Sequence, residues 1–302
     1  MKILIAAVIA ALITTVAVNG QVERSKLYTI FDGEGNRLTF EDLISRLGTA
    51  DVVFLGEYHD DSVGHAFQAE VFRAAYEKYQ GERSVALSLE MFESDVQYIL
   101  DEYLSGKITE DHFLASGRPW KNYKTDYRPL VEFAKENRLS VIAANAPRRY
   151  VNMVSRNGRG SLDSLSKQAK KTLAPLPFGE SSEAYSAKFR NLMSAMPAAS
   201  GGSSRIDNIL QSQTLWDATM AWWISRHLKK NKKALVVHLN GGFHTESRLG
   251  TPEHLSKYRK KSKSLVVTIR YEKDYGTFDP EKHKGIGDFV VLTDASQPRS
   301  GK

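Results

Sequence analysis

The chain contains 302 residues, of which 41% are hydrophobic and 25% are charged. This composition is typical of a globular protein with a sizeable core, and the length predicts one large domain or a domain with an insertion. The absence of cysteine excludes disulfide bonds, thiolate metal ligands and the lipid-modified cysteine of a lipoprotein. The formal net charge is +7, but the basic runs at residues 229–233 and 257–261 are more typical of solvated helix ends than of a site for phosphate or anionic lipid.

Residues 1–20 are typical of a secretory signal peptide. Lys2 is followed by an apolar run over residues 3–18 and then by Asn19-Gly20-Gln21, with a small residue where a peptidase would cut. The run is shorter than the roughly 20 residues of a membrane-spanning helix, and a retained anchor is the alternative. We therefore expect an exported protein, periplasmic or associated with the envelope, that is not a lipoprotein. We expect peripheral or no membrane attachment and no binding of nucleic acid.

The first predicted elements are a β-hairpin, with strands at residues 27–30 and 37–40, and a short helix over residues 41–47. Thr39 and Asp42 resemble a capping box at the start of that helix. Beyond it, short β-branched or apolar runs alternate with longer helical patterns, which predicts an α/β fold with a mainly parallel sheet flanked by helices. The predicted strands span residues 52–55, 84–89, 139–144, 234–239, 265–270 and 289–292.

Residues 155–207 interrupt this alternation. They contain prolines, a flexible Gly-Gly-Ser-Ser run and a helical pattern over residues 182–193, with no predicted strand. We interpret the segment as a helical insertion or lid over one edge of the sheet. The predicted organisation is thus a single domain over residues 21–294, with this insertion, and a disordered tail over residues 295–302.

Polar side chains follow four of the predicted strands, at the point where each strand ends. Because the carboxyl ends of parallel strands share one edge, and ligands bind in the crevice there, we expect these side chains to converge on one pocket. The residues are Glu57, His59, Glu90, Asn145, Arg148 and His244.

Two of these loops share the pattern Gly-x-x-His, in GEYH and GGFH. Glycine lets the backbone turn sharply at the end of a strand, and histidine supplies a nitrogen that acts as a base, a ligand or a donor. Because each motif directly follows a strand, the pair favours a functional site. The alternative is two histidines that only form hydrogen bonds within their own loops.

Helices contribute further candidates. His65 and Gln68 lie three residues apart and project from one face of the helix that follows the first loop. Gln213 and Asp217 interrupt an apolar helical stripe, so they either brace the core or face the pocket. Residues 118–130 mix arginine with aromatic residues, which could line a flat ligand or simply pack as a loop.

Several motifs of familiar enzyme classes are absent from the sequence. It contains no His-Glu-x-x-His, no Gly-x-Ser-x-Gly and no phosphate-binding glycine loop. A classical zinc protease, serine hydrolase or nucleotide-binding protein is therefore disfavoured.

Six segments together resemble the ChaN-like haem-binding uptake proteins of the Tiki superfamily. They are FLGEYHDD, LEMFE, RPWKNYKTDYRPLVEFAKEN, VIAANAPRRYV, LWDATMA and HLNGGFH. The resemblance covers about residues 51–255 and implies an α/β fold and haem binding in iron acquisition at the bacterial envelope. The same segments also resemble the erythromycin-esterase-like and Tiki proteins, whose related site is hydrolytic and sometimes metal-dependent. The positions that match are Glu57, His59 and His244, whereas the lack of cysteine departs from the many family members that are lipoproteins.

The first functional hypothesis is an exported haem carrier. Its axial ligand would be His59, His65, His244 or a tyrosine, and Arg148 or Arg149 would bind the propionates. A homodimer is left open. The other residues expected at the ligand are Gln68, Glu90, Asn145, Gln213 and Asp217.

The alternative is a metal-dependent hydrolase, an esterase or a peptidase. Glu57 or a histidine would activate water on a divalent ion held by His59, His244 and a carboxylate such as Glu57. Oxygen and nitrogen donors without thiolate suit zinc, manganese or cobalt. A superfamily member that serves only as an envelope scaffold is a third interpretation.

Overall fold

A computed structural model of the chain describes residues 27–195 and 203–300. The predicted signal peptide lies outside the described residues, so export remains a prediction. Within the two described ranges, no helix is both long and apolar enough to cross a membrane.

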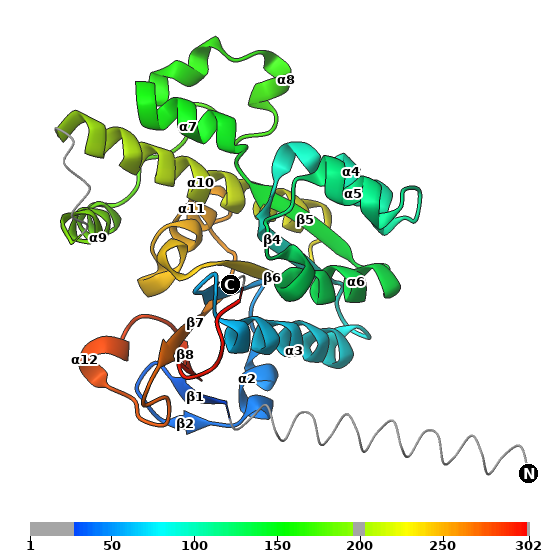
Figure 1. Ribbon diagram of the computed structural model, residues 1–302, viewed down its shortest axis with the longest axis vertical. Helices are drawn as coiled ribbons and strands as arrows, with labels where there is room; N and C mark the ends of the chain where they lie inside the picture. Colours follow the sequence, from blue (N-terminus) through cyan, green and yellow to red (C-terminus); the bar gives the residue numbers. More distant parts are fainter. Residues whose placement is uncertain (1–26, 196–202, 301–302) are drawn as a thin grey trace, which may run out of the picture.

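An eight-stranded mixed sheet forms the centre of the described part of the chain (Figure 1). The strand order is β2-β1-β8-β7-β3-β6-β4-β5, in which β1 runs antiparallel to both of its neighbours and the strands from β8 to β5 are parallel. The hairpin and all the predicted strands are present, which confirms the mainly parallel α/β fold. The strands are β1 (Tyr28–Asp32), β2 (Arg37–Leu38), β3 (Val52–Glu57), β4 (Val85–Glu93), β5 (Ser140–Asn145), β6 (Leu235–Gly241), β7 (Ser264–Glu272) and β8 (Phe289–Asp294).

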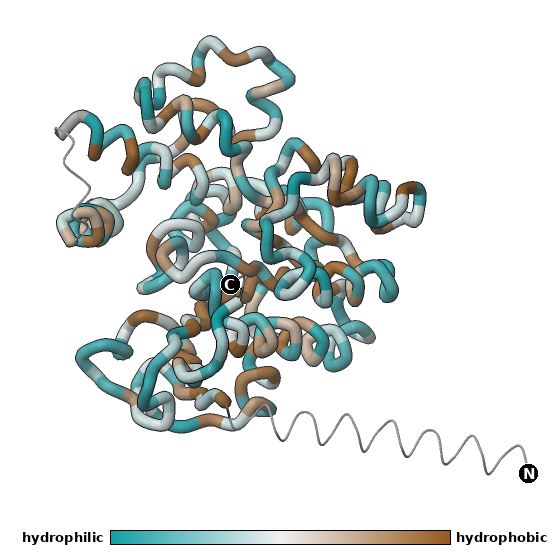
Figure 2. The backbone as a smooth tube through the Cα atoms, in the orientation of Figure 1, coloured by the Kyte–Doolittle hydropathy of each residue, from teal (hydrophilic) through white to brown (hydrophobic). Residues whose placement is uncertain are grey.

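Helices cover both faces of the sheet. One face packs against α2 to α6, and the other packs against α10 and α11 (Figure 1). Apolar and hydrophilic stretches alternate along these helices in Figure 2, as expected for elements with one buried side. The helices are α2 (Phe40–Leu47), α3 (Ser62–Tyr79), α4 (Gln97–Leu104), α5 (Glu110–Gly117), α6 (Arg128–Glu136), α7 (Arg148–Asn157), α8 (Lys167–Lys170), α9 (Glu183–Ser194), α10 (Ser203–Lys230), α11 (Thr251–Tyr258) and α12 (Pro280–His283).

Alternate residues of each strand point to opposite faces of the sheet. On β3, Val53 and Leu55 belong to the core under α3, whereas Val52 and Phe54 belong to the core under α10. This follows from the two-residue period of a strand, and both faces are apolar because helices cover both. Phe54 has no exposed surface, and truncating such a side chain to alanine costs about 3–5 kcal/mol.

The predicted capping box at the start of α2 is confirmed. The backbone N–H of Asp42 donates to the Thr39 hydroxyl at 3.0 Å, and the Asp42 carboxylate accepts from the Thr39 backbone N–H, also at 3.0 Å. These two bonds satisfy backbone donors that the first helical turn leaves unpaired.

The segment from residue 155 to residue 207 is helical and contains no strand among its described residues. Its elements gather with α7 and α10 at the end of the molecule opposite to β1 and β2 (Figure 1). The segment packs against α10 through a separate apolar cluster that includes Leu162, Leu173 and Phe178. The division of the chain into a domain and an insertion remains a prediction.

The structure describes residues 295–300 of the predicted disordered tail, and the disorder of the tail as a whole remains a prediction. Residues 295–300 pack against the loop after β3 and the start of α3. The Arg299 guanidinium pairs with the Asp60 carboxylate and lies 3.6 Å from the centre of the Tyr271 ring. The Ser62 hydroxyl donates to the Pro298 carbonyl oxygen at 2.6 Å. Residues 295–300 thus contact residues that are distant in the sequence, and composition alone does not reveal such contacts.

Candidate active and ligand-binding site

Glu57, the last residue of β3, anchors the first loop of the predicted site. Its side chain is fully buried, because it continues the face of β3 that carries Val53 and Leu55 into the core under α3. Oε1 accepts a hydrogen bond from the Tyr127 hydroxyl at 2.6 Å and lies 2.9 Å from Nδ1 of His59. Oε2 has no hydrogen-bonding partner among the described residues.

His65 completes this group from α3. Its Nε2 lies 3.5 Å from Oε1 of Glu57, and its Nδ1 lies 3.3 Å from Oδ2 of Asp126. Asp126 and Tyr127 come from the π-helical turn Tyr123–Tyr127, which leads into α6. Such turns place extra side chains at functional sites in many proteins. We call Glu57, His59, His65, Asp126 and Tyr127 the Glu57 cluster.

Charge pairing fixes the protonation of the Glu57 cluster. Burial alone would raise the pKa of Glu57, but hydrogen bonds from His59 and His65 outweigh burial and lower this pKa to about 2. Burial opposes the charge on His65 as well, yet Asp126 and Glu57 raise its pKa to about 10. At neutral pH the cluster therefore holds an imidazolium, His65, between two carboxylates.

His244 is the centre of a second group. Its Nδ1 lies 2.9 Å from Oδ1 of Asp217, which also accepts from the Thr251 hydroxyl at 2.8 Å. The other oxygen of Asp217 accepts from the Tyr185 hydroxyl. Nε2 of His244 lies 3.8 Å from Oε1 of Glu90. We call Glu90, Tyr185, Asp217, His244 and Thr251 the His244 cluster.

The second group is also charged and tightly bonded. Burial lowers the pKa of His244 on its own, but the charges of Asp217 and Glu90 outweigh it and raise the pKa to about 9. Oε2 of Glu90 accepts from the backbone N–H of Gly241 at 2.7 Å, which ties β4 to the end of β6. The Asp217 carboxylate orients the imidazole, as the acid of a general-base pair does.

The two clusters lie on opposite faces of the sheet and meet at its carboxyl edge. Glu57 lies on the α3 side, whereas Glu90 is joined through His244 to Asp217 of α10. They meet at Gly241, where an added Cβ would lie 2.8 Å from Nε2 of His59 and 3.8 Å from Oε2 of Glu90. Glycine at this position therefore permits His59 to approach the His244 cluster.

Five of the predicted ligand-binding residues join neither cluster. Gln68 donates to the Leu55 carbonyl oxygen at 3.3 Å, and Asn145 accepts from the backbone N–H of the next residue at 2.9 Å. Arg149 pairs with Asp95 at 2.6 Å. The other two are Arg148, which is exposed, and Gln213, which is half-buried.

The predicted metal role of Glu57, His59 and His244 gains no support from the geometry. Within the part of the chain that the structure describes, no group of three or more histidine and carboxylate side chains is placed to hold a metal ion. Oε1 of Glu57 and Oδ1 of Asp217 instead accept hydrogen bonds from tyrosine, threonine and histidine.

Sequence reasoning did not assign site roles to four residues of the two clusters. Asp126 and Tyr127 lie in the segment 118–130, whose mixture of arginine and aromatic residues predicts either a surface for a flat ligand or a packed loop. The adjacent acid and phenol in that segment are the signal that could have indicated a site. Tyr185 comes from α9 and Thr251 begins α11. No local pattern distinguishes these two from ordinary helix residues.

The chain was compared with protein families and with known proteins. The model of the family described as "Haem-binding uptake, Tiki superfamily, ChaN" matches residues 43–255, which is more than half of the chain. The chain belongs to this family. The match includes Glu57, His59 and His244 and confirms the resemblance that the sequence motifs indicate.

One solved structure supports the same fold. A structure that concerns cofacial haem binding to ChaN of Campylobacter jejuni has a TM-score of 0.66 and 21% sequence identity, and the match covers 89% of this chain and 98% of that one. An erythromycin esterase, EreC, is also similar, with a TM-score of 0.46, 13% identity, and coverage of 84% and 78%. Protein RETICULATA-RELATED 5, chloroplastic, of Arabidopsis thaliana is 24% identical over 287 residues, which are 89% of this chain and 37% of that protein.

Proposed function

We propose that this chain is an exported haem-binding protein that takes part in haem or iron acquisition at the cell envelope. Haem binding is supported by the family to which the chain belongs and by the similar fold of ChaN of Campylobacter jejuni, whose structure concerns cofacial haem binding. Export rests on the pattern of residues 1–20. The uptake role rests on that pattern and on the family.

The exposure of His59 carries the proposal of a haem ligand. The His59 side chain is 46% exposed, whereas the exposed fractions of His65 and His244 are 3% and 9%. Its Nδ1 is bound by Glu57, and its Nε2 has no hydrogen-bonding partner among the described residues. A carboxylate on one ring nitrogen orients the other toward iron, as in many metal-binding histidines. We therefore propose that Nε2 of His59 would bind the haem iron.

The surroundings of His59 suit a flat aromatic ligand. The Trp120 ring packs edge-on against His59, with 4.8 Å between the ring centres. Tyr58 is partly exposed beside it and packs against Tyr271, and the Arg270 guanidinium lies 5.4 Å from the centre of the Tyr58 ring. Bound haem would supply the iron; the chain supplies a ring nitrogen and an aromatic surface. Arg270 is paired with the Glu246 carboxylate at 2.8 Å, so it is not a free cation for a propionate.

The test is a titration of the mature protein with haemin, followed in the Soret band. Wild type is expected to give a saturable shift that His59→Ala abolishes, because the ring nitrogen that would bind the iron is lost. His112→Ala is the matched control, since His112 is an exposed histidine on α5, and it should bind as wild type does. Loss of the shift in Tyr58→Phe but not in His59→Ala would assign the ligand to the phenolate. A shift unchanged in both variants would refute a site at this loop.

A hydrolase is the second candidate, because Asp217 orients the His244 ring as a carboxylate orients a catalytic imidazole. With a pKa of about 9, His244 is an imidazolium at neutral pH. In that function it would donate a proton to the leaving group, and Asp217 would hold the ring in place. Hydrolysis of a chromogenic ester that disappears in Asp217→Asn would support this function. Equal rates in wild type and in the variant would exclude it for that ester.

A further inference from the structure

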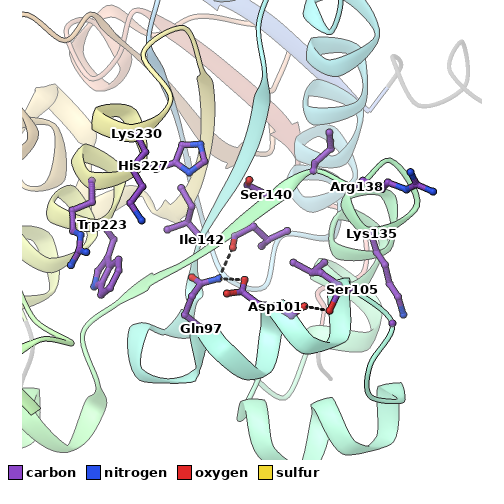
Figure 3. Close-up of a pocket in the computed structure, with 15 residues that line it drawn as sticks. Gln97, Asp101, Ser105, Lys135, Arg138, Ser140, Ile142, Trp223, His227 and Lys230 are labelled. Atoms are coloured by element: carbon purple, nitrogen blue, oxygen red, sulfur yellow. Dashed lines mark hydrogen bonds between the residues drawn. The ribbon is translucent and has the colours of Figure 1, made fainter. Parts of the chain in front are cut away.

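A groove with a volume of about 790 Å³ lies at the amino edge of the sheet, opposite to the two clusters. It runs along β5, the edge strand, between α10 on one side and α4 with the end of α6 on the other (Figure 3). Its volume is within the usual range of small-molecule sites, about 300–1,000 Å³. We call it the basic groove, because Lys135, Arg138, Arg226 and Lys230 line it.

The four cations stand in two pairs. Lys135 and Arg138 lie on one side of β5, and Arg226 and Lys230 belong to α10 on the other side; Figure 3 shows Lys230 and Arg138 across the strand from one another. Within the described part of the chain, none of the four forms an ion pair with a carboxylate, and Asp101 is the one acid that lines the groove. The cations of the groove therefore outnumber its one carboxylate, and the groove carries a net positive charge.

Helix ends explain why cations gather here, but they do not explain the groove. In a parallel sheet the covering helices end at the amino edge, and cations stabilise the negative end of a helix dipole. Cations that extend into solvent would stabilise the helix dipole equally well. Here Lys135 Nζ lies 3.7 Å from the centre of the Tyr103 ring, and the Arg226 guanidinium lies 4.9 Å from that of Trp223. Both cations are thus held beside the groove by aromatic rings.

The backbone at Arg138 is a second, independent feature. Its φ angle is 55°, in the left-handed region that favours glycine, at the residue just after α6 and its cap. Leu139 N–H closes the helix end by donating to the Ala134 carbonyl oxygen at 2.8 Å. Arginine is less favourable than glycine in this conformation. The position nevertheless carries an arginine, and that residue lines the groove.

The floor of the groove favours a small molecule over a polypeptide strand. The Gln97 side-chain amide donates to the Val141 carbonyl oxygen at 2.8 Å and accepts from the Ala143 N–H at 2.7 Å. Gln97 thereby occupies the place of a neighbouring strand, so β5 cannot pair there with an added strand. Ile142 and Trp223 give the groove apolar surface between the two cationic pairs. The Trp223 indole N–H donates to the Thr172 carbonyl oxygen, so its ring offers apolar contact.

We propose that the basic groove binds an organic dicarboxylate with an apolar middle. One carboxylate contacts Lys135 and Arg138, the other contacts Arg226 and Lys230, and the apolar middle lies over Ile142 and Trp223. The site is separate from the haem site and does not depend on it.

The test is calorimetric titration of the whole protein with a series of linear dicarboxylates, from succinate to dodecanedioate. A long member such as decanedioate is expected to bind with one-to-one stoichiometry and more tightly than decanoate, its monocarboxylate counterpart, because only the dianion reaches both pairs. Added salt should weaken the binding, since the contacts are ionic and partly exposed.

Two variants remove one cation from each pair without disturbing the fold. Arg138→Gly suits the left-handed backbone and should fold at least as stably as wild type, and Arg226→Gln keeps a good helix former. Each should weaken decanedioate binding by about tenfold, the value of one charged hydrogen bond. Lys229→Gln is the matched control, because Lys229 is an adjacent exposed cation that does not line the groove.

The results separate the outcomes. Binding that is weakened in both groove variants and kept in the control supports the proposal, whatever the result of the haemin titration. The proposal is overturned if no dicarboxylate binds saturably or if Arg138→Gly and Arg226→Gln bind as wild type does. Equal affinity for decanoate and decanedioate would also overturn it, since one pair of cations would then suffice.

Discussion

His65 holds a buried positive charge between Glu57 and Asp126, and replacing it tests the electrostatics of the Glu57 cluster. His65→Gln removes the imidazolium and leaves two carboxylates without their counter-charge. The rise of the His65 pKa from 6.5 to about 10 corresponds to about 5 kcal/mol of preference for the charged form. Because breaking a buried pair typically costs about 3–5 kcal/mol, we expect a loss of that size in the free energy of unfolding at pH 6.

The pH dependence follows from the signs of the two pKa changes. His65 has a raised pKa, so its contribution is complete below pH 6.5 and disappears as the pH rises through about 10. Glu57 has a lowered pKa, so its contribution is complete above about 4.5 and disappears as the pH falls toward 2. The stability difference between wild type and His65→Gln should therefore be largest near pH 6 and about half as large at pH 8.

Urea unfolding followed by circular dichroism measures these differences. The double variant Glu57→Gln with His65→Gln should lose less stability than the two single losses together, by about 1–3 kcal/mol, because neither charge then lacks the other. His112→Gln is the control: this exposed histidine should change stability by no more than about 0.5 kcal/mol. Additive losses, or a difference that does not shrink between pH 6 and pH 8, would refute the charged pair.

Three further predictions concern the ends of the strands. Haemin affinity should rise with pH across neutrality. Partial desolvation opposes the charge on His59, but the hydrogen bond with Glu57 and the charge of Glu90 outweigh it and raise the pKa, and only the neutral ring binds iron. A Soret titration at several pH values measures the affinity, and a flat profile would exclude His59. Gly241→Ala should weaken haemin binding without loss of fold, since the added Cβ would lie 2.8 Å from Nε2 of His59. Unchanged binding in the same titration would contradict the role of His59 in binding haemin. Asp217→Asn should lower the His244 pKa from about 9 toward 6.5. Proton NMR of the histidine ring measures this pKa. A value still near 9 would show that Glu90, and not Asp217, raises the pKa of His244.

The sequence was sufficient for the elements of the fold and for the edge of the sheet where polar residues gather. Strands such as Val52–Glu57 and Leu235–Gly241 are runs of β-branched and apolar residues, and Thr39 with Asp42 is a local cap. These signals act over a few residues, so periodicity and capping chemistry reveal them. The GEYH and GGFH loops follow their strands directly, and parallel pairing alone brings them to one edge.

Only the tertiary structure decided how those residues are divided and which of them is accessible. Strand parity and helix packing place Glu57 and Glu90 on opposite faces, bury His65 and His244, and leave His59 exposed. Tyr185 reaches Asp217 from a helix about thirty residues earlier in the chain, and the basic groove joins three segments that no sequence pattern connects. Such contacts depend on how distant elements pack, and that packing is determined by the whole core and not by the local sequence.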